Sequence, residues 1–226
     1  MLLSLIGEKI DLDSRSIFKV AYSEKIIKIE VSGSSKQYIN GSKKMTQPEY
    51  AIYPWDKNYD WCSNCYHEYS KKPWITFSLI NKQFKFNGYF VRNGCCYYNG
   101  CCCDDDFYGC IDCYMYSWSL QISNDNKTWT TVHQIEKDSD KDNCKSREYK
   151  FDKTYTARYV RLIQDAPFPG YPPCFAINRF DLFGTIVNDD GSLSDGNADD
   201  FVSYHDDDDD VSIIGHISKN GNAKFD

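Results

Sequence analysis

The stretch of sequence that decides the fold is SWSLQISNDNKTWTTV, residues 117–132. Residues 117–123 alternate between polar and apolar side chains, which predicts a strand with one buried face. The run at 124–126, Asn-Asp-Asn, has side chains that bond to nearby backbone groups and tolerate left-handed dihedral angles. We therefore expect the chain to reverse there and to return as a second strand at 130–136.

Outward from this stretch, short strand-like runs separated by turn residues continue from Ser16 to about Val187, and no stretch of ten or more residues shows a helical stripe. Many short strands without helices between them predict an antiparallel sandwich or barrel. The expected strands are 25–33, 73–80, 84–94, 117–123, 130–136, 148–151, 158–164 and 175–187. The side chains expected at the buried centre are Trp74, Phe77, Trp118, Leu120, Trp129, Tyr159, Val160, Leu162 and Phe183.

Together with WITF at 74–77, RYVRLIQ at 158–164 and a closing FAINRFDLFG at 175–184, this sequence resembles the discoidin domain, also called the coagulation factor V/VIII type C domain. The resemblance covers about residues 17–187. It implies an all-β, antiparallel, eight-stranded jelly-roll sandwich of the galactose-binding-like superfamily. The chain is also similar to versions found in intracellular proteins of protists, because KIIKIEVSGSS at 25–35 and NYDWCS at 58–63 match their opening segments.

Charge is distributed unevenly along the 226 residues. The chain has 33 acidic and 26 basic residues, and residues 188–226 contain 11 of the acidic and 2 of the basic ones. The net charge of this segment is therefore −9, whereas that of residues 1–187 is +2. We expect residues 1–16 to be a lead-in, and residues 188–226 to be an acidic disordered tail. No basic domain favours nucleic acid as a partner.

The compartment is predicted from the N-terminus and the cysteines. The opening MLLSLIGEKIDLD at 1–13 has a short apolar patch without a basic region, which is a poor signal peptide. No apolar run reaches the ~18 residues typical of a membrane-spanning helix. A cytoplasmic or nuclear protein is therefore expected, with an extracellular or cell-surface location as the alternative. The eleven cysteines would be thiols or zinc ligands inside the cell, and disulfides in an exported protein.

The resemblance implies that ligands meet loops at one end of the sandwich. Three loops in this chain are rich in aromatic and acidic residues: 55–70, 94–116 and 165–174, of which the second is a Cys-rich insertion. Aromatic rings stack on apolar faces of sugars or enter protein pockets, and carboxylates bond hydroxyl groups. The candidate ligand-binding residues are Trp55, Asp56, Asn58, Tyr59, Asp60, Tyr97, Tyr98, Phe107, Tyr108, Phe168 and Tyr171.

Two metal sites are considered, although no cofactor is required by the expected function. Cys62-x-x-Cys65 and Cys110-x-x-Cys113 are pairs that can each place two thiolates on one zinc ion. A structural zinc would fix the insertion, and the alternatives are thiols or disulfides. The oxygen side chains of Asp56, Asn58 and Asp60 alternate as calcium ligands do. The resemblance places a further acid near Arg179, and a cation there would repel calcium.

In the tail, Val211, Ile213 and Ile214 follow the acidic run 206–210. This pattern resembles a SUMO-interacting motif, in which a short apolar strand adds to the edge of a partner's sheet. The alternative is an acidic solubilising tail with a chance apolar patch.

Catalytic motifs such as Gly-x-Ser-x-Gly and His-Glu-x-x-His do not occur in this sequence. We therefore expect a binding module and not an enzyme. The main hypothesis is an intracellular protein–protein interaction or adaptor domain that binds through the loops at one end of the sandwich. The alternative is an extracellular or surface lectin-like domain that binds glycans or phospholipid headgroups. The sequence does not indicate an oligomeric state.

Overall fold

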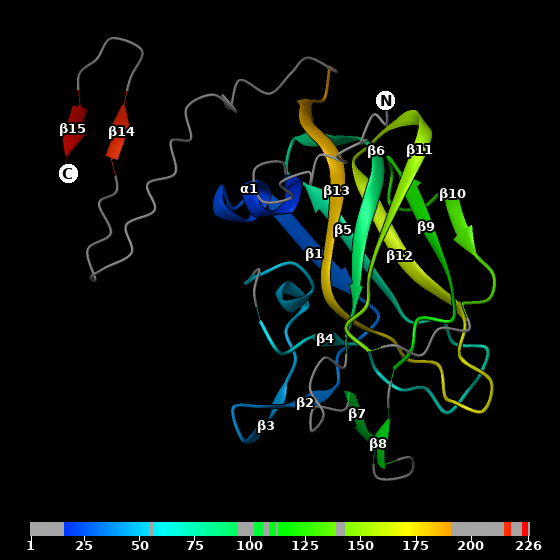
Figure 1. The fold of residues 1–226 in the computed structure, drawn as a ribbon. Helices are drawn as coiled ribbons and strands as arrows, with labels where there is room; N and C mark the ends of the chain where they lie inside the picture. Colours follow the sequence, from blue (N-terminus) through cyan, green and yellow to red (C-terminus); the bar gives the residue numbers. More distant parts are fainter. Residues whose placement is uncertain are drawn as a thin grey trace, which may run out of the picture. The chain divides into compact units, whose positions relative to one another are not determined.

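Two antiparallel β-sheets face each other in the computed structural model (Figure 1). It describes residues 16–54, 57–94, 102–105, 109–111, 113–138, 143–190, 215–217 and 223–225. One sheet has the order β1-β5-β12-β9-β10, comprising Ile27–Val31, Trp74–Leu79, Tyr159–Ala166, Ser117–Ser123 and Thr130–Ile135. The other has the order β11-β6-β13-β4, comprising Ser146–Ala157, Lys82–Asn93, Ala176–Asn188 and Trp61–Cys62.

All eight strands expected from the sequence are present in these two sheets, and the all-β antiparallel sandwich is confirmed. Several short elements were not expected. Helix α1 has seven residues, which is too short for its sequence to display a helical stripe, and the Ser16 hydroxyl caps it by accepting a hydrogen bond from the Lys19 N–H at 3.1 Å. The other unexpected elements are the 3₁₀ helix η1 and strands β2, β3, β7 and β8, in addition to β4. Their bounds are α1 Ile17–Ser23, η1 Pro48–Ala51, β2 Lys36–Ile39, β3 Ser42–Met45, β7 Cys102–Asp105 and β8 Gly109–Ile111.

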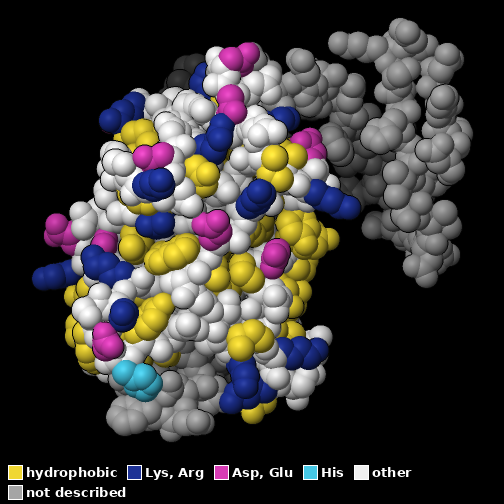
Figure 2. Space-filling view, turned by 180° about the vertical axis from the view of Figure 1, so that it is seen from behind, with side chains coloured by type: hydrophobic (Ala, Val, Ile, Leu, Met, Phe, Trp, Pro, Cys, Tyr) yellow, Lys and Arg dark blue, Asp and Glu magenta, His cyan; other side chains and the backbone are white. Residues whose placement is uncertain are grey.

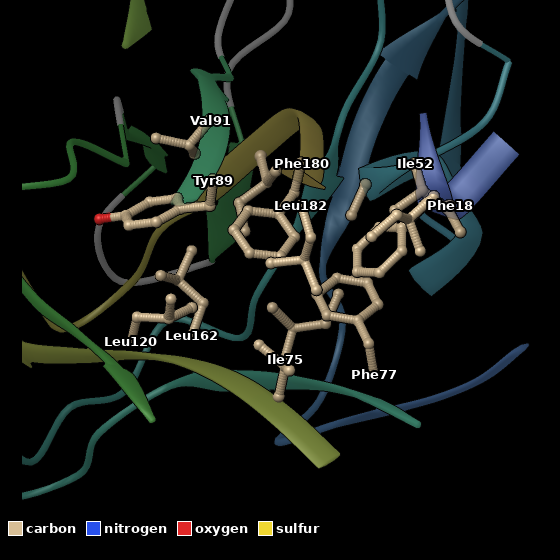
Figure 3. Packing of buried hydrophobic residues seen from close by; sticks show 14 of the residues in the cluster. Phe18, Ile52, Ile75, Phe77, Tyr89, Val91, Leu120, Leu162, Phe180 and Leu182 are labelled. Carbon is tan, nitrogen blue, oxygen red and sulfur yellow. The ribbon is translucent and has the colours of Figure 1, made fainter. Parts of the chain in front are cut away.

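The hydrophobic core fills the space between the two sheets (Figure 3). The side chains that meet there alternate along their strands, as a buried sheet face requires. Helix α1 extends the core through Phe18, whose ring lies 4.7 Å from that of Phe77 and 5.6 Å from that of Phe180. The residues labelled in Figure 3 are Ile75, Phe77, Leu120 and Leu162 from one sheet, Tyr89, Val91, Phe180 and Leu182 from the other, and Phe18 and Ile52 beside them.

The predicted core is correct for five side chains and wrong for four. Those that are fully or almost fully buried are Phe77, Trp118, Leu120, Val160 and Leu162. Those that are only half-buried are Trp74, Trp129, Tyr159 and Phe183. For Trp74, Tyr159 and Phe183 the reason is the two-residue period of a strand, because each is next to a buried position and points to the other face of the sheet. Trp129 lies just before β10 begins.

Two of these residues, Trp74 and Trp129, stack on an arginine instead of entering the core. The guanidinium group of Arg161 lies 3.6 Å from the centre of the Trp129 ring and 4.8 Å from that of Trp74. Tyr159 shares the strand face of Arg161, opposite to Val160. Tryptophan faces attract cations, so these aromatic side chains cover the outer face of the five-stranded sheet.

The turn between β9 and β10 forms as predicted. The carboxylate of Asp125 accepts hydrogen bonds from the backbone N–H groups of Lys127 at 2.8 Å and Thr128 at 2.7 Å. These bonds hold the pKa of Asp125 well below its ordinary value. Asn126 has a φ angle of 58°, which is the left-handed conformation expected for this run.

The chain divides into two compact units, Met1–Ser194 and Asp195–Asp226. The described part of the second unit is an antiparallel pair, β14 Gly215–Ile217 with β15 Ala223–Phe225. Val211, Ile213 and Ile214 lie outside the described residues, so the partner motif, the tail and the domain boundaries stay predictions. Within the ranges that the structure describes, every helix is too short or too polar to cross a bilayer.

Candidate functional site

The first and third predicted loops lie side by side at one end of the sandwich. The backbone N–H of Tyr66 donates a 3.1 Å hydrogen bond to the carbonyl oxygen of Pro173. Next to this bond, Ser63 and Phe175 are joined twice, by a backbone bond of 3.0 Å and by a 3.0 Å bond from the Phe175 N–H to the Ser63 hydroxyl oxygen. These bonds extend the β4–β13 pairing into the loops and set their positions.

A group of four aromatic rings joins the end of the second loop to the third loop. We call it the end-loop aromatic cluster; its members are Tyr114, Tyr116, Phe168 and Tyr171. The rings meet edge to face, with Phe168 at 5.2 Å from Tyr116, 5.9 Å from Tyr114 and 5.8 Å from Tyr171. All four are half-buried, so part of each ring faces solvent. Phe168 and Tyr171, two of the predicted ligand-binding residues, therefore lie together in this cluster, and their role in binding stays a prediction.

The buried side chain of Gln164 holds both halves of this cluster. Its amide Nε2 donates to the carbonyl oxygen of Cys174 at 2.7 Å and to that of Tyr114 at 3.3 Å. Gln164 was not among the site residues predicted from the sequence. A signal was present, because Gln164 follows Val160 and Leu162 on the inward face of β12, where a polar side chain needs a hydrogen-bonding partner.

Three sulfur atoms from the three loops also meet here. The Sγ atoms of Cys65, Cys113 and Cys174 lie within 4.8 Å of one another, and we call them the sulfur cluster. Cys113 and Cys174 are buried thiols, and Cys65 is half-buried and disulfide-bonded. Cys174 is distant in sequence from both C-x-x-C pairs and was not among the predicted zinc ligands.

Cys62, like Cys65, is disulfide-bonded in this structure, and so is Cys144. Zinc binds thiolates, and a sulfur atom engaged in a disulfide cannot supply one. The predicted zinc set would thus require a reduced chain, and the side chain of its fourth member, Cys110, lies outside the described residues. The zinc site stays a prediction.

The calcium set is divided between solvent and interior. Asn58 is exposed, whereas Asp60 is fully buried. The Asp60 carboxylate accepts hydrogen bonds from the side-chain amides of Gln37 at 2.7 Å and Asn178 at 3.0 Å. Both carboxylate oxygens are therefore bonded to amides within the protein. Asp56 lies outside the described residues, so calcium binding also stays a prediction.

A shallow cavity of about 370 Å³ is lined by Pro54, Lys57, Asn58 and Tyr59. The Lys57 ammonium group donates to the carbonyl oxygens of Pro54 and Asn178, and the Asn178 side-chain amide donates to the carbonyls of Lys57 and Tyr59 at 3.2 Å. The pKa of Tyr59 is raised above its ordinary value, mainly because the side chain is partly buried. The first loop thus contributes Asn58 and Tyr59 to this cavity and Cys65 to the sulfur cluster.

Six of the predicted ligand-binding residues lie outside the residues that are described: Trp55, Asp56, Tyr97, Tyr98, Phe107 and Tyr108. In the Cys-rich insertion, strands β7 and β8 pair as an antiparallel hairpin, and β7 contacts β2. On the face opposite to the view of Figure 1, hydrophobic side chains are interspersed with lysines, arginines and acidic residues (Figure 2).

Several solved structures are similar to this chain. One is CpGH89CBM32-5 from Clostridium perfringens, in complex with GalNAc-β-1,3-galactose, at 15% identity and a TM-score of 0.47, covering 70% of this chain and 95% of that chain. A second is chitosan-binding module 1 of a chitosanase/glucanase from Paenibacillus sp. IK-5, at 17% identity and a TM-score of 0.45, covering 70% of this chain and 94% of that chain. A third is the C-terminal domain of a chitobiase from Bacteroides fragilis, at 15% identity and a TM-score of 0.45, covering 71% of this chain and 95% of that chain.

A search among curated protein sequences found no significant match. A family model matches part of the sequence. Residues 106–174 match the model of the F5/8 type C domain. This segment includes β9, β10, β11, β12 and all four members of the end-loop aromatic cluster. The resemblance of this chain to the discoidin, or F5/8 type C, domain is thereby confirmed.

Proposed function

We propose that the protein is a non-catalytic binding module that captures a glycan through the end-loop aromatic cluster. The observation that carries this proposal is the meeting of Tyr114, Tyr116, Phe168 and Tyr171 at the loop end, each with part of its ring in solvent. Flat aromatic faces stack on the apolar faces of sugar rings, and tyrosine hydroxyl groups bond to sugar hydroxyls. This is the alternative hypothesis from the sequence, and it fits the site better than the adaptor hypothesis does.

Rigidity of the third loop supports a binding role. Segment 167–173 reads PFPGYPP, and each proline fixes its own φ angle. The Tyr171 N–H donates a 2.9 Å hydrogen bond to the Phe168 carbonyl oxygen, and Gly170 between them has a φ angle of 86°, which favours glycine. With the anchoring by Gln164, little conformational entropy remains to be lost when a ligand binds.

Polar groups that suit sugar hydroxyls lie at the start of the third loop. The Asp165 carboxylate accepts hydrogen bonds from the Lys72 ammonium group at 3.2 Å and from the Ser119 hydroxyl. Lys72 is exposed and Asp165 is partly exposed. A carboxylate and an ammonium group side by side can accept from and donate to neighbouring hydroxyl groups.

We also propose an extracellular or cell-surface location. Disulfide bonds form and persist in oxidising compartments, and they are rare in the cytosol. The disulfide-bonded states of Cys62, Cys65 and Cys144 support this alternative over a cytoplasmic or nuclear one.

The experiment is a screen of the full chain on a glycan array, followed by calorimetric titration of the best glycan. We expect Phe168→Ala and Tyr171→Ala to weaken binding at least tenfold while the melting temperature changes little. Tyr38→Ala is the matched control, because Tyr38 is an exposed aromatic residue, 51% accessible, on the separate hairpin β2–β3. Equal affinity of all three variants and the unmodified protein would contradict the proposed site.

A further inference from the structure

The sulfur cluster is a feature that glycan binding does not use. Its three members come from three different loops: Cys65 from the first, Cys113 from the second and Cys174 from the third. Around them pack the buried Cys62 and Ala176 and the half-buried Tyr171. The cluster therefore lies in an apolar layer that touches the end-loop aromatic cluster at Tyr171.

The members of the sulfur cluster differ in oxidation state. Cys65 takes part in a disulfide, whereas Cys174 is a thiol. A disulfide sulfur with a thiol beside it is the starting arrangement for thiol–disulfide exchange. Cys174 is only 2% exposed, so thiols in solution reach it poorly and its accessible reaction partners are within the cluster.

We propose that the sulfur cluster is an internal thiol–disulfide exchange site, in which Cys174 and the present disulfide partner of Cys65 compete for the Cys65 sulfur atom. The thiolate of Cys174 attacks Sγ of Cys65, and a Cys65–Cys174 bond forms as the existing disulfide bond of Cys65 breaks. The departing cysteine leaves as a thiolate and takes up the proton that Cys174 released. One disulfide replaces another, so the step consumes no external oxidant or reductant.

Backbone contacts already hold the two reacting segments together. The Tyr66 N–H bonds to the Pro173 carbonyl oxygen at 3.1 Å, so the residues that follow Cys65 and precede Cys174 are hydrogen-bonded to each other. Cysteine has a single side-chain torsion before its sulfur, and a change of rotamer moves that atom without moving the backbone. Exchange would therefore alter the covalent connection beneath the aromatic cluster while the sandwich stays intact.

Disulfide mapping of the full chain tests this proposal. The protein is incubated without reductant at pH 5 or pH 8, quenched with acid, denatured, alkylated and digested, and its linked peptides are identified by mass spectrometry. Because the thiolate is the attacking species, we expect a Cys65–Cys174 peptide that is several times more abundant after incubation at pH 8. Complete alkylation of Cys174 at both pH values, with no such peptide, would overturn the proposal.

Two variants identify the attacking residue. Cys174→Ser should abolish the linked peptide, whereas Cys113→Ser, which removes the other buried sulfur of the cluster, should retain it. A Cys65–Cys113 peptide in the unmodified protein, lost in Cys113→Ser, would contradict the assignment of Cys174. The mapping of the unmodified protein decides the question even if a variant does not fold. The outcome is also independent of glycan binding, since it is read from peptides alone.

Discussion

The indole N–H of Trp118 donates a 3.2 Å hydrogen bond to the hydroxyl oxygen of Tyr89, and this bond joins the two sheets across the core. Trp118 lies on β9 and Tyr89 on β6, and both side chains are almost completely buried. The Tyr89 hydroxyl is also 2.9 Å from Nδ1 of His133 on β10. Burial strongly raises the pKa of Tyr89 and lowers that of His133, so both groups remain neutral and can share a hydrogen bond.

Replacing Tyr89 by Phe should lower the free energy of unfolding by about 1–3 kcal/mol, because the buried N–H of Trp118 loses its acceptor. Urea denaturation measures this change. Tyr155→Phe is the matched control, since Tyr155 is a half-buried tyrosine whose ring packs against Phe86 and Phe151. Equal changes in the free energy of unfolding for the two replacements would show that the hydrogen bonds of the Tyr89 hydroxyl do not stabilise the fold.

The two tryptophans of the fold-deciding stretch should differ in their contribution to stability. Trp118→Ala opens a large cavity in the core and should cost about 3–5 kcal/mol. Trp129→Ala loses a half-exposed ring that stacks on Arg161, so about 1–2 kcal/mol is expected. Thermal and urea unfolding of both variants provide the comparison, and equal costs would contradict the outer position of Trp129.

Gly184 is required by the close approach of β13 to β6. A Cβ atom added there would lie 2.0 Å from the carbonyl oxygen of Lys85 and 2.7 Å from Cα of Phe86. Both are backbone atoms, so the strands must move apart, and Gly184→Ala should cost about 2–3 kcal/mol. Thr185→Ala, at the next and exposed position, should stay within about 0.5 kcal/mol. If Gly184→Ala were as stable as the unmodified protein, β13 and β6 would have to lie further apart than the structure shows.

The buried carboxyl group of Asp181 should make stability depend on pH. Burial raises its pKa from 3.8 to about 6, although the N–H groups of Phe18 and Leu182 donate hydrogen bonds to it. Between these pH values the native protein holds a proton that the unfolded chain has released. Stability should therefore fall by about 2–3 kcal/mol as the pH rises from about 4 to about 6, and should then level off.

Urea denaturation across this pH range gives the slope. Asp181→Asn should flatten it, because asparagine has no proton to lose. Asp152→Asn, at an exposed position on β11, should keep it. An unchanged slope in Asp181→Asn would mean that another group causes the pH dependence.

Alternation explains why the strands were predictable and why part of the core was not. Phe77, Trp118 and Leu162 each lie within a polar–apolar alternation, and this pattern identifies a strand and its inner face. Trp74 and Tyr159 are large and apolar, but each lies at an odd number of positions from a buried residue of its own strand. Size and hydrophobicity favoured burial, whereas the strand period assigned them to the outer face, and the period is the stronger constraint.

The site was predictable at the level of loops and not of contacts. Phe168 and Tyr171 are in one proline-rich segment, so their proximity follows from the sequence. The meeting of Cys65 with Cys174 depends on the pairing of β4 with β13, and β4 is too short to be recognised as a strand. Long-range pairings of this kind carry no local sequence signal, so the sulfur cluster required the structure.

The bonds between Asn178 and the segment 57–59 have a consequence for self-association. Strand β4 pairs with β13 only at Ala176 and Ile177, and an open strand edge is a template onto which another chain can add. Next to this pairing, the Lys57 ammonium group is bonded to the Asn178 carbonyl oxygen, and the Asn178 amide is bonded to two carbonyls of the segment. An incoming strand would have to displace these bonds first, so this margin of the sandwich resists aggregation by intermolecular sheet extension.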